Sequence, residues 1–220
     1  MRNIFKSIQN TLFGRWKILS AMRKGNMDEI EKLLEEKPGL VNSKNAFGES
    51  LLHETAFKGN KEITELLISK GANVASKDID GLTPLHWAAQ NGHQEVAEAL
   101  ILTGVKVDEK DNAGLPPIYY ATLGGHKKMV EYLLSKDMDI NEKYRTGETL
   151  LHKVIKRGLE EMVSLLIKNN AHINIKDKKG RSPLSIAKLR GQQEIVEILQ
   201  KYGAKVDWEG DIFPIQTYTH

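Results

Sequence analysis

The chain of 220 residues contains no cysteine. It therefore has no disulfide framework, no thiolate metal ligand and no cysteine nucleophile. No run of about 18 or more apolar residues occurs, so we expect no membrane-spanning helix. Residues 1–22 hold no continuous apolar stretch typical of a secretory signal peptide. These absences favour an intracellular, cytoplasmic protein, and secretion by a route that needs no disulfides stays open.

Short motifs of common enzyme classes are absent as well. The sequence contains no HExxH, no GxSxG and no P-loop, and no cysteine or histidine spacing resembles a zinc site. We therefore expect no catalytic activity, no cofactor, no metal and no small-molecule substrate.

The chain does contain an internal period of 33 residues. Five glycines follow that period, namely Gly48, Gly81, Gly114, Gly147 and Gly180. The text near them repeats as SLLHETAFKGN, TPLHWAAQNGH, PPIYYATLGGH, TLLHKVIKRGL and SPLSIAKLRGQ. A fixed period of this length indicates one supersecondary unit that is copied and stacked.

One unit carries the clearest motif. Gly81-Leu82-Thr83-Pro84-Leu85-His86, followed by Ala88-Ala89, resembles the ankyrin repeat. The resemblance implies an all-α repeat solenoid of stacked helix-turn-helix units with β-hairpin loops. We expect a single array over 16–207, with a degenerate N-terminal cap at 16–44 and full repeats at 45–77, 78–110, 111–143, 144–176 and 177–207. An amphipathic extension, 1–15, and a tail, 208–220, would flank it.

Residues 78–110 illustrate how one unit is expected to fold. Thr83 before Pro84 suits a helix N-cap followed by proline at the first helical position. This first helix is predicted to end at Gly92, because glycine takes the left-handed conformation without steric cost. The second helix has a buried stripe and stops at Gly104; the stripe consists of Val96, Ala97, Leu100 and Ile101.

Two further patterns concern the framework. A branched apolar residue recurs after each second helix, and we expect these residues in the continuous core: Val41, Val74, Val107, Ile140, Ile173 and Val206. Repeat three departs from the motif, because Pro116 and Tyr119 stand where the motif has threonine and histidine. Pro116 cannot cap through a side chain, so this helix start loses about 1 kcal/mol of capping.

Seven histidines invite a metal or acid–base interpretation. By resemblance to the family, the imidazoles of His53, His86 and His152 instead link backbone and side chains within and between repeats. His93 and His126 follow the glycine that ends the first helix, which is another habitual position. We therefore interpret these histidines as structural.

In ankyrin-like arrays, the hairpin tips and the exposed side of each first helix line a concave groove that generally recognises a protein. The candidate contact residues are those that vary while the framework stays fixed. They are Phe47, Phe57, Ile79, Asp80, Leu82, Trp87, Asn112, Leu115, Tyr120, Leu123, Arg145, Lys156, Arg157, Lys178, Lys179, Arg181 and Arg190.

The candidate residues change in character along the chain. The first three full repeats offer mainly apolar and aromatic groups, and residues 45–143 have a net charge of −5. The last two offer a cationic end, and residues 144–203 have a net charge of +6. We therefore expect a protein-interaction scaffold whose partner carries apolar anchors followed by an acidic stretch. For Trp87 and Tyr120, half-burial against the next first helix is the competing interpretation.

Other functions stay open. The basic repeats four and five could bind nucleic acid or another anionic ligand, although no aromatics interleave their cations for base stacking. Residues 1–15 contain no acidic residue and place apolar side chains on one helical face, namely Ile4, Phe5, Ile8 and Leu12. They could lie on an anionic membrane surface as part of an adaptor, pack on the first unit or act as a targeting segment.

Two segments suggest smaller roles. Asn42, Asn141 and Asn174 resemble asparagines that are hydroxylated in some animal ankyrin repeats. The tail from Trp208 to Ile215 carries apolar anchors that could cover the last repeat or serve as a docking peptide.

Overall fold

The computed structural model describes residues 2–136 and 138–205, with side chains from residue 12 onward. The chain divides between Met138 and Asp139 into two compact units, called unit 1 and unit 2 below. The described helices of unit 1 are α1 (Arg2–Lys24), α2 (Met27–Glu36), the 3-10 helix η1 (Pro38–Asn42), α3 (Leu51–Lys58), α4 (Lys61–Ser69), α5 (Pro84–Asn91), α6 (Gln94–Ile101), α7 (Pro117–Leu123) and α8 (Lys127–Leu134). Those of unit 2 are α9 (Leu150–Arg157), α10 (Glu160–Lys168), α11 (Pro183–Leu189) and α12 (Gln193–Lys201).

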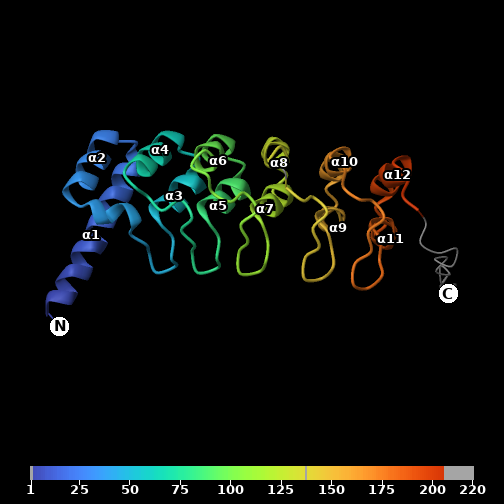
Figure 1. Ribbon diagram of the computed structural model, residues 1–220, viewed down its shortest axis with the longest axis horizontal. Coiled ribbons are helices and arrows are strands. Elements are labelled where there is room, and N and C mark those ends of the chain that lie inside the picture. The colour runs from blue at the N-terminus through green and yellow to red at the C-terminus, as the bar shows by residue number, and fades with distance from the viewer. Residues whose placement is uncertain (1, 137, 206–220) are drawn as a thin grey trace, which may run out of the picture. The chain divides into compact units, whose positions relative to one another are not determined.

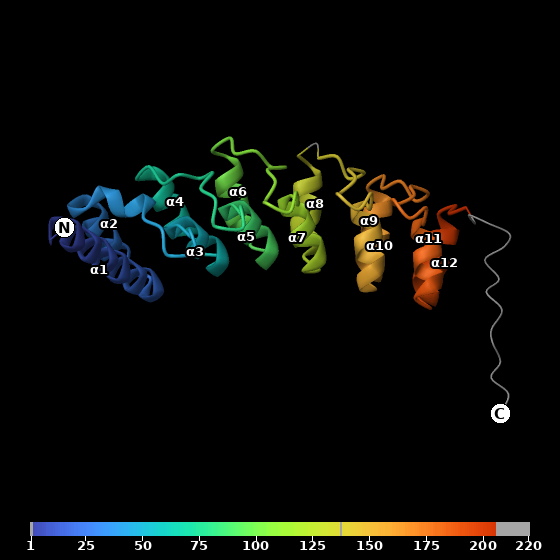
Figure 2. The same ribbon diagram turned by 90° about the horizontal axis from the view of Figure 1, so that it is seen from below.

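Each unit is a stack of helix pairs (Figures 1 and 2). In unit 1, α3 packs against α5 and α5 against α7, while α4 packs against α6 and α6 against α8. In unit 2, α9 packs against α11 and α10 against α12. The predicted all-α stacking of helix pairs is confirmed.

The loops that precede α3, α5 and α7 project from one side of the helices in unit 1 (Figure 1). Against the expectation of β-hairpins, the described loops contain no strand, and the one isolated bridge among them joins Lys44 and Ser50. Tight turns close the loops instead: the backbone N–H of Asp78 donates to the carbonyl of Leu82 at 3.0 Å. The N–H of Gly81 donates back to the carbonyl of Asp78 at 3.1 Å.

The first helix of a repeat starts with a reciprocal cap. At α5, the Thr83 hydroxyl accepts from the backbone N–H of His86, and Nδ1 of His86 accepts from the N–H of Thr83 at 3.1 Å. Such a pair satisfies two of the N–H groups that a helix start leaves unpaired. At α7, Pro116 occupies the cap position and forms no side-chain hydrogen bond, as predicted.

Successive turns lie edge to edge in unit 1. The N–H of Ile79 donates to the carbonyl of Phe47 at 3.0 Å, and the N–H of Asn112 donates to the carbonyl of Asp80 at 2.9 Å. Gly81 between them has φ +80°, and a Cβ there would lie 2.8 Å from the backbone nitrogen of Asn112. All five periodic glycines have a positive φ, so a left-handed turn is what they share. A close approach between turns adds a second reason at Gly48, Gly81 and Gly147, but not at Gly114 or Gly180.

The motif histidines connect neighbouring repeats. Nε2 of His53 donates to the carbonyl of Leu82 at 3.0 Å, and Nε2 of His86 to that of Leu115 at 3.1 Å. In unit 2, Nε2 of His152 donates to the carbonyl of Arg181 at 3.3 Å. A second set of links starts at the helix-terminal histidines: His93 donates to Phe57 and His126 to Gln90, again at main-chain carbonyls. The structural interpretation of these five imidazoles agrees with every one of these contacts.

The core consists mainly of residues from the helices. Buried apolar side chains include Leu52, Ile63, Leu67, Leu100 and Leu133 in unit 1, and Leu151 and Leu166 in unit 2. The prediction for the branched residues after each second helix is wrong in part: Val41 is buried, but Val74, Val107, Ile140 and Ile173 are only partly buried. They sit in exposed connecting segments, where one face of the side chain remains in contact with water. Val206 lies outside the described residues.

One helix, α1, runs through the expected boundary between extension and cap at residue 15. Gly14 is buried, and a Cβ there would lie 3.0 Å from the side chain of Leu40. Nη1 of buried Arg15 donates to the carbonyl of Ser43 at 2.5 Å. The C-terminal part of α1 therefore packs on unit 1, while the predicted tail at 208–220 lies outside the described residues.

Candidate partner-binding surfaces

Trp87 is an aromatic candidate of unit 1 that is fixed by hydrogen bonding and ring contacts. Its Nε1 donates to Oδ2 of Asp78 at 3.0 Å. Its ring meets the rings of His53 and Phe57 edge-on, at centroid distances of 5.7 and 5.8 Å. The side chain is half-buried, and its ring contacts lie on the preceding first helix, α3, rather than on the next one as expected. A contact role for Trp87 stays a prediction.

Tyr120 repeats this arrangement one period later. Its hydroxyl donates to Oδ2 of Asp111, and its ring meets that of His86 edge-on at 5.8 Å. Burial and the bond to Asp111 raise the pKa of the Tyr120 phenol well above its ordinary value. Tyr120 therefore presents a neutral aromatic ring, fixed by the turn of its own repeat.

Large apolar side chains are exposed on the same unit. Phe47 and Ile79 are each 61% exposed, at the tips of turns that are hydrogen-bonded to each other. Phe57 is exposed at the end of α3, and the remaining apolar candidates, Leu82, Leu115 and Leu123, are partly buried. We call Phe47, Phe57, Ile79, Leu82 and Trp87 the apolar surface of unit 1.

The two polar candidates of unit 1 differ. Asp80 is exposed. Asn112 is exposed too, but its Nδ2 donates to the carbonyl of Ile79 at 3.0 Å, so its amide joins neighbouring turns. The side chain of Asn112 therefore has a structural role in joining these two turns.

A pocket that the sequence did not suggest lies beside α1, α3 and α4, with a volume of about 320 Å³. Leu19, Met22, Arg23, Glu54, Thr55, Lys58, Asn60 and Ile63 line it. Apolar side chains stand beside charges of both signs, which suits an apolar anchor with a polar neighbour. No repeat pattern marks this pocket, because its residues come from the degenerate cap and the first full repeat.

In unit 2 the central feature is Glu148, which is buried. Its Oε2 pairs with Nζ of Lys153 at 2.6 Å and accepts from the hydroxyl of Thr146 at 2.7 Å, and its Oε1 pairs with Lys156. Burial raises the pKa of Glu148, but the hydrogen bonds from Lys153, Lys156 and Thr146 outweigh it and bring the pKa to about 2. Glu148 is thus an anion that holds two lysines in place.

Glu148 compensates for a change elsewhere in its repeat. The turns of other repeats carry Asp78, Asp111 and Asp177, and the equivalent residue of this repeat is Tyr144. The carboxylate comes from Glu148, four residues later. Its partner Lys153 occupies the position of Trp87 and Tyr120. The sequence analysis did not predict that Glu148 takes the place of the turn aspartate. The presence of Glu148 near Lys153, Lys156 and Arg157 in the same repeat could have indicated it.

Two of the cationic candidates in unit 2 are paired with carboxylates. Nη2 of Arg181 pairs with Oδ2 of Asp177 at 2.7 Å, and Lys156 pairs with Glu148. The other cationic candidates of unit 2 are exposed: Arg145, Arg157, Lys178, Lys179 and Arg190. We call these five residues the basic surface of unit 2.

A set of lysines at the repeat period also went unnoticed in the sequence. Nζ of Lys44 donates to the carbonyl of Lys77 at 2.8 Å, and Nζ of Lys77 to that of Lys110 at 3.0 Å. In unit 2, Nζ of Lys143 donates to the carbonyl of Lys176 at 3.2 Å. These lysines brace consecutive loops.

The asparagines noted for hydroxylation also link repeats. Nδ2 of Asn42 donates to the carbonyl of Gly71 at 3.1 Å, and Oδ1 accepts from the N–H of Asn73 at 2.7 Å. Asn141 bonds in the same way to residues 170 and 172, and Asn174 accepts from the N–H of Lys205. Their side chains are structural in this state, and their hydroxylation stays a prediction.

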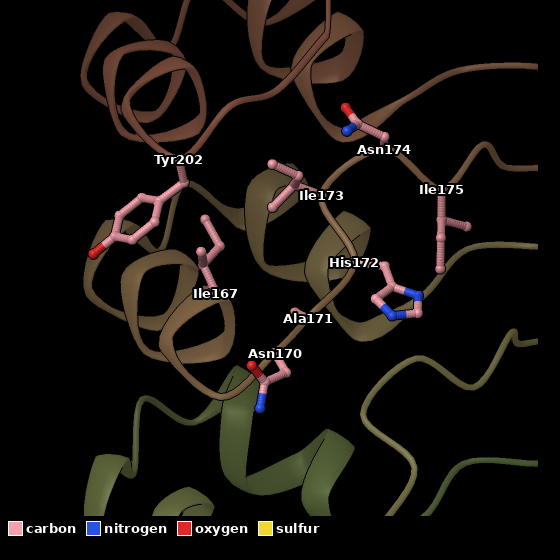
Figure 3. Close-up of a pocket in the computed structure, with 8 residues that line it drawn as sticks. All are labelled: Ile167, Asn170, Ala171, His172, Ile173, Asn174, Ile175 and Tyr202. Carbon is pink, nitrogen blue, oxygen red and sulfur yellow. The ribbon is translucent and has the colours of Figure 1, made fainter.

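Unit 2 also holds a shallow pocket of about 710 Å³ (Figure 3). Ile167, Asn170, Ala171, His172, Ile173, Asn174, Ile175 and Tyr202 line it. Among these described lining residues, the titratable side chains are His172 and Tyr202, which form no cluster of acid–base groups. Across the described residues, no group of three or more His, Cys, Asp or Glu could hold a metal ion.

Comparisons with known proteins add one match. The family model described as "Ankyrin repeats (3 copies)" matches residues 18–111, 75–144 and 118–209. A comparison with curated protein sequences found no match. Within the described part of the chain, no helix is both long and apolar enough to cross a membrane.

Proposed function

The chain belongs to the ankyrin repeat family, and from that premise we propose that it is a non-catalytic scaffold that binds a protein partner. Ankyrin repeats typically mediate protein–protein interactions, and the family is generally non-catalytic. The apolar surface of unit 1 would bind the partner's apolar anchors. The basic surface of unit 2 would bind an acidic segment of the same partner.

The observation that carries this proposal is the pair of exposed turn residues, Phe47 and Ile79. Their backbones are hydrogen-bonded to each other, so two large side chains are held at fixed positions in water. Binding would immobilise little additional backbone, which lowers the entropic cost of association. Exposed apolar groups gathered on one surface are common features of interaction sites.

The test is a double substitution, Phe47→Ser with Ile79→Ser. Affinity capture followed by mass spectrometry with the wild-type chain identifies the partner, and the variant should lose it because hot-spot side chains of this kind contribute about 2 kcal/mol or more each. The melting temperature should stay unchanged, since both side chains are exposed.

Leu102→Ser is the matched control, because Leu102 is 87% exposed at the end of α6 and lies outside the apolar surface of unit 1. It should retain the partner. Equal capture by the double variant and the control would contradict the proposal.

Binding of nucleic acid by the basic surface of unit 2 is the weaker proposal. Two of the seven predicted cations, Lys156 and Arg181, are paired with carboxylates. A gel shift whose affinity falls steeply with salt would support this function. Absence of a shift at low salt would exclude it.

A further inference from the structure

Helix α1 has two opposite faces. Gly14, Arg15, Ile18 and Ala21 are buried against the rest of unit 1. At the same stretch of helix, Leu12, Phe13 and Trp16 are 58%, 56% and 62% exposed. The packed face alone attaches α1 to the rest of unit 1. Packing on the fold therefore does not explain why the opposite face carries large apolar side chains.

The exposed face is aromatic and compact. The rings of Phe13 and Trp16 are stacked, with centroids 6.1 Å apart. Nζ of Lys17 lies 4.9 Å from the centroid of the Phe13 ring. In Figure 1 the N-terminal part of α1 projects away from α2.

The charge of α1 has one sign. The 23 residues of the helix include six basic and no acidic residues. Arg15 is committed to the fold through its bond to Ser43, and Lys17, Arg23 and Lys24 are exposed. A second copy of the chain would bring two such helices together and place like charges close to each other, which opposes self-association.

We propose that the exposed face of α1 docks on an anionic lipid bilayer. Aromatic and aliphatic side chains beside lysine and arginine are typical of helices that lie in the membrane interface. Leu12, Phe13 and Trp16 would insert into the boundary between headgroups and acyl chains, while Lys17, Arg23 and Lys24 contact anionic headgroups. The scaffold would thereby be held at a membrane surface.

The test is co-sedimentation of the full chain with vesicles of phosphatidylcholine containing about 30% phosphatidylserine. The triple variant Leu12→Ser/Phe13→Ser/Trp16→Ser should lower the vesicle-bound to free ratio by about tenfold or more, because all three apolar groups are lost. Its melting temperature should match that of the wild type, since none of the three is buried. Binding equal to that of the wild type would overturn the proposal.

A charge reversal tests the electrostatic part. Lys17→Glu/Lys24→Glu should weaken binding severalfold, and about 0.5 M salt should do the same to the wild type. Lys127→Glu/Lys128→Glu is the matched control, since both lysines are exposed in the first turn of α8. Equal binding to pure phosphatidylcholine vesicles, or an equal effect of both reversals, would contradict the selection of anionic lipid.

Two measurements distinguish membrane docking from partner binding and from self-association. Phe47→Ser/Ile79→Ser should bind vesicles as the wild type does, so loss of the protein partner and loss of the membrane are distinguishable. Sedimentation velocity without vesicles should show the same mass for the wild type and the α1 triple variant. If the wild type is a dimer and the triple variant a monomer, the exposed face of α1 binds a second copy of the chain. That result would overturn the proposal.

Discussion

Nε1 of Trp87 and Oδ2 of Asp78 are joined by a hydrogen bond of 3.0 Å, and the two residues belong to the helix and the turn of one repeat. The same carboxyl accepts from the N–H groups of Asp80 and Leu82 through its other oxygen. The turn and the aromatic ring are therefore fixed by one side chain. The ring of Trp87, a candidate contact residue, is therefore held in place without a bound partner.

Trp87→Phe should lower the free energy of unfolding by about 1 kcal/mol, because it removes this hydrogen bond and keeps an aromatic ring. Asp78 would keep its two backbone partners, so the turn should survive. Urea denaturation of wild type and variant measures the change. Trp87→Leu should be more destabilising, since the edge-on contacts with His53 and Phe57 are lost as well. Equal stability of all three proteins would show that the bond contributes nothing.

The free energy of unfolding should fall as the pH drops below about 6.5. Burial lowers the pKa of His53, His86 and His152 below the ordinary value, so the unfolded chain binds protons more readily than the folded one. Protonation would also place a proton on Nδ1, which accepts from a backbone N–H in all three. Thermal melts between pH 7.5 and 5.5 test this.

The controls for that pH dependence are two glutamine variants. His86→Gln should reduce the slope of stability against pH, because one of the three buried imidazoles is gone. His172→Gln should leave it as in the wild type, because His172 is exposed. A slope that His86→Gln does not alter would assign the dependence to other groups.

Glu148→Gln should destabilise the protein by about 1–3 kcal/mol at pH 7, because it removes the charge that Lys153 and Lys156 share. The folded-state pKa of about 2 is below the unfolded value, so this stabilisation is present at neutral pH and is lost as the pH falls from about 4.3 towards 2. The difference between wild type and variant should shrink over that range. Glu197→Gln, an exposed change in α12, should stay within about 0.5 kcal/mol of the wild type at both ends.

Alanine substitutions at two glycines with the same φ distinguish the cost of the left-handed conformation from the cost of a steric clash. Gly81 and Gly114 both have φ +80°, but a Cβ at Gly81 would lie 2.5 Å from Oδ1 of Asn112, and a Cβ at Gly114 meets nothing within 4 Å. Gly114→Ala should destabilise by about 1–2 kcal/mol through the left-handed conformation alone. Gly81→Ala should destabilise by about 1–3 kcal/mol more. Similar values for both would mean that the neighbouring turn yields easily.

The repeat framework could be predicted because each of its characteristic residues has one physical role, such as starting or ending a helix. The 33-residue period, the Thr83–Pro84 helix start and the glycine at φ +72° after α5 all appear in the structure as the sequence indicates. The predicted stripe of α6 is buried at Val96, Ala97 and Leu100, but Ile101 is only partly buried. The branched residues of the connecting segments are mostly only partly buried, because a spacing of 33 shows repetition and not burial.

The contact surfaces were less predictable, since exposure depends on neighbours that are distant in sequence. Phe47 and Ile79 are exposed as expected, yet Lys156 and Arg181 carry charges that Glu148 and Asp177 compensate. Composition alone predicts a boundary at residue 15, but α1 continues across it from Arg2 to Lys24. The contact role of all these residues stays a prediction.

The histidine hydrogen bonds between repeats end on main-chain carbonyl oxygens, and this has a consequence for the evolution of the sequence. His53, His86 and His152 reach the carbonyls of Leu82, Leu115 and Arg181, whose side chains are candidate contact residues. A carbonyl is the same in every amino acid, so these positions can exchange their side chains without disturbing the joint. New binding preferences can therefore arise one substitution at a time while the histidine bond between repeats is kept.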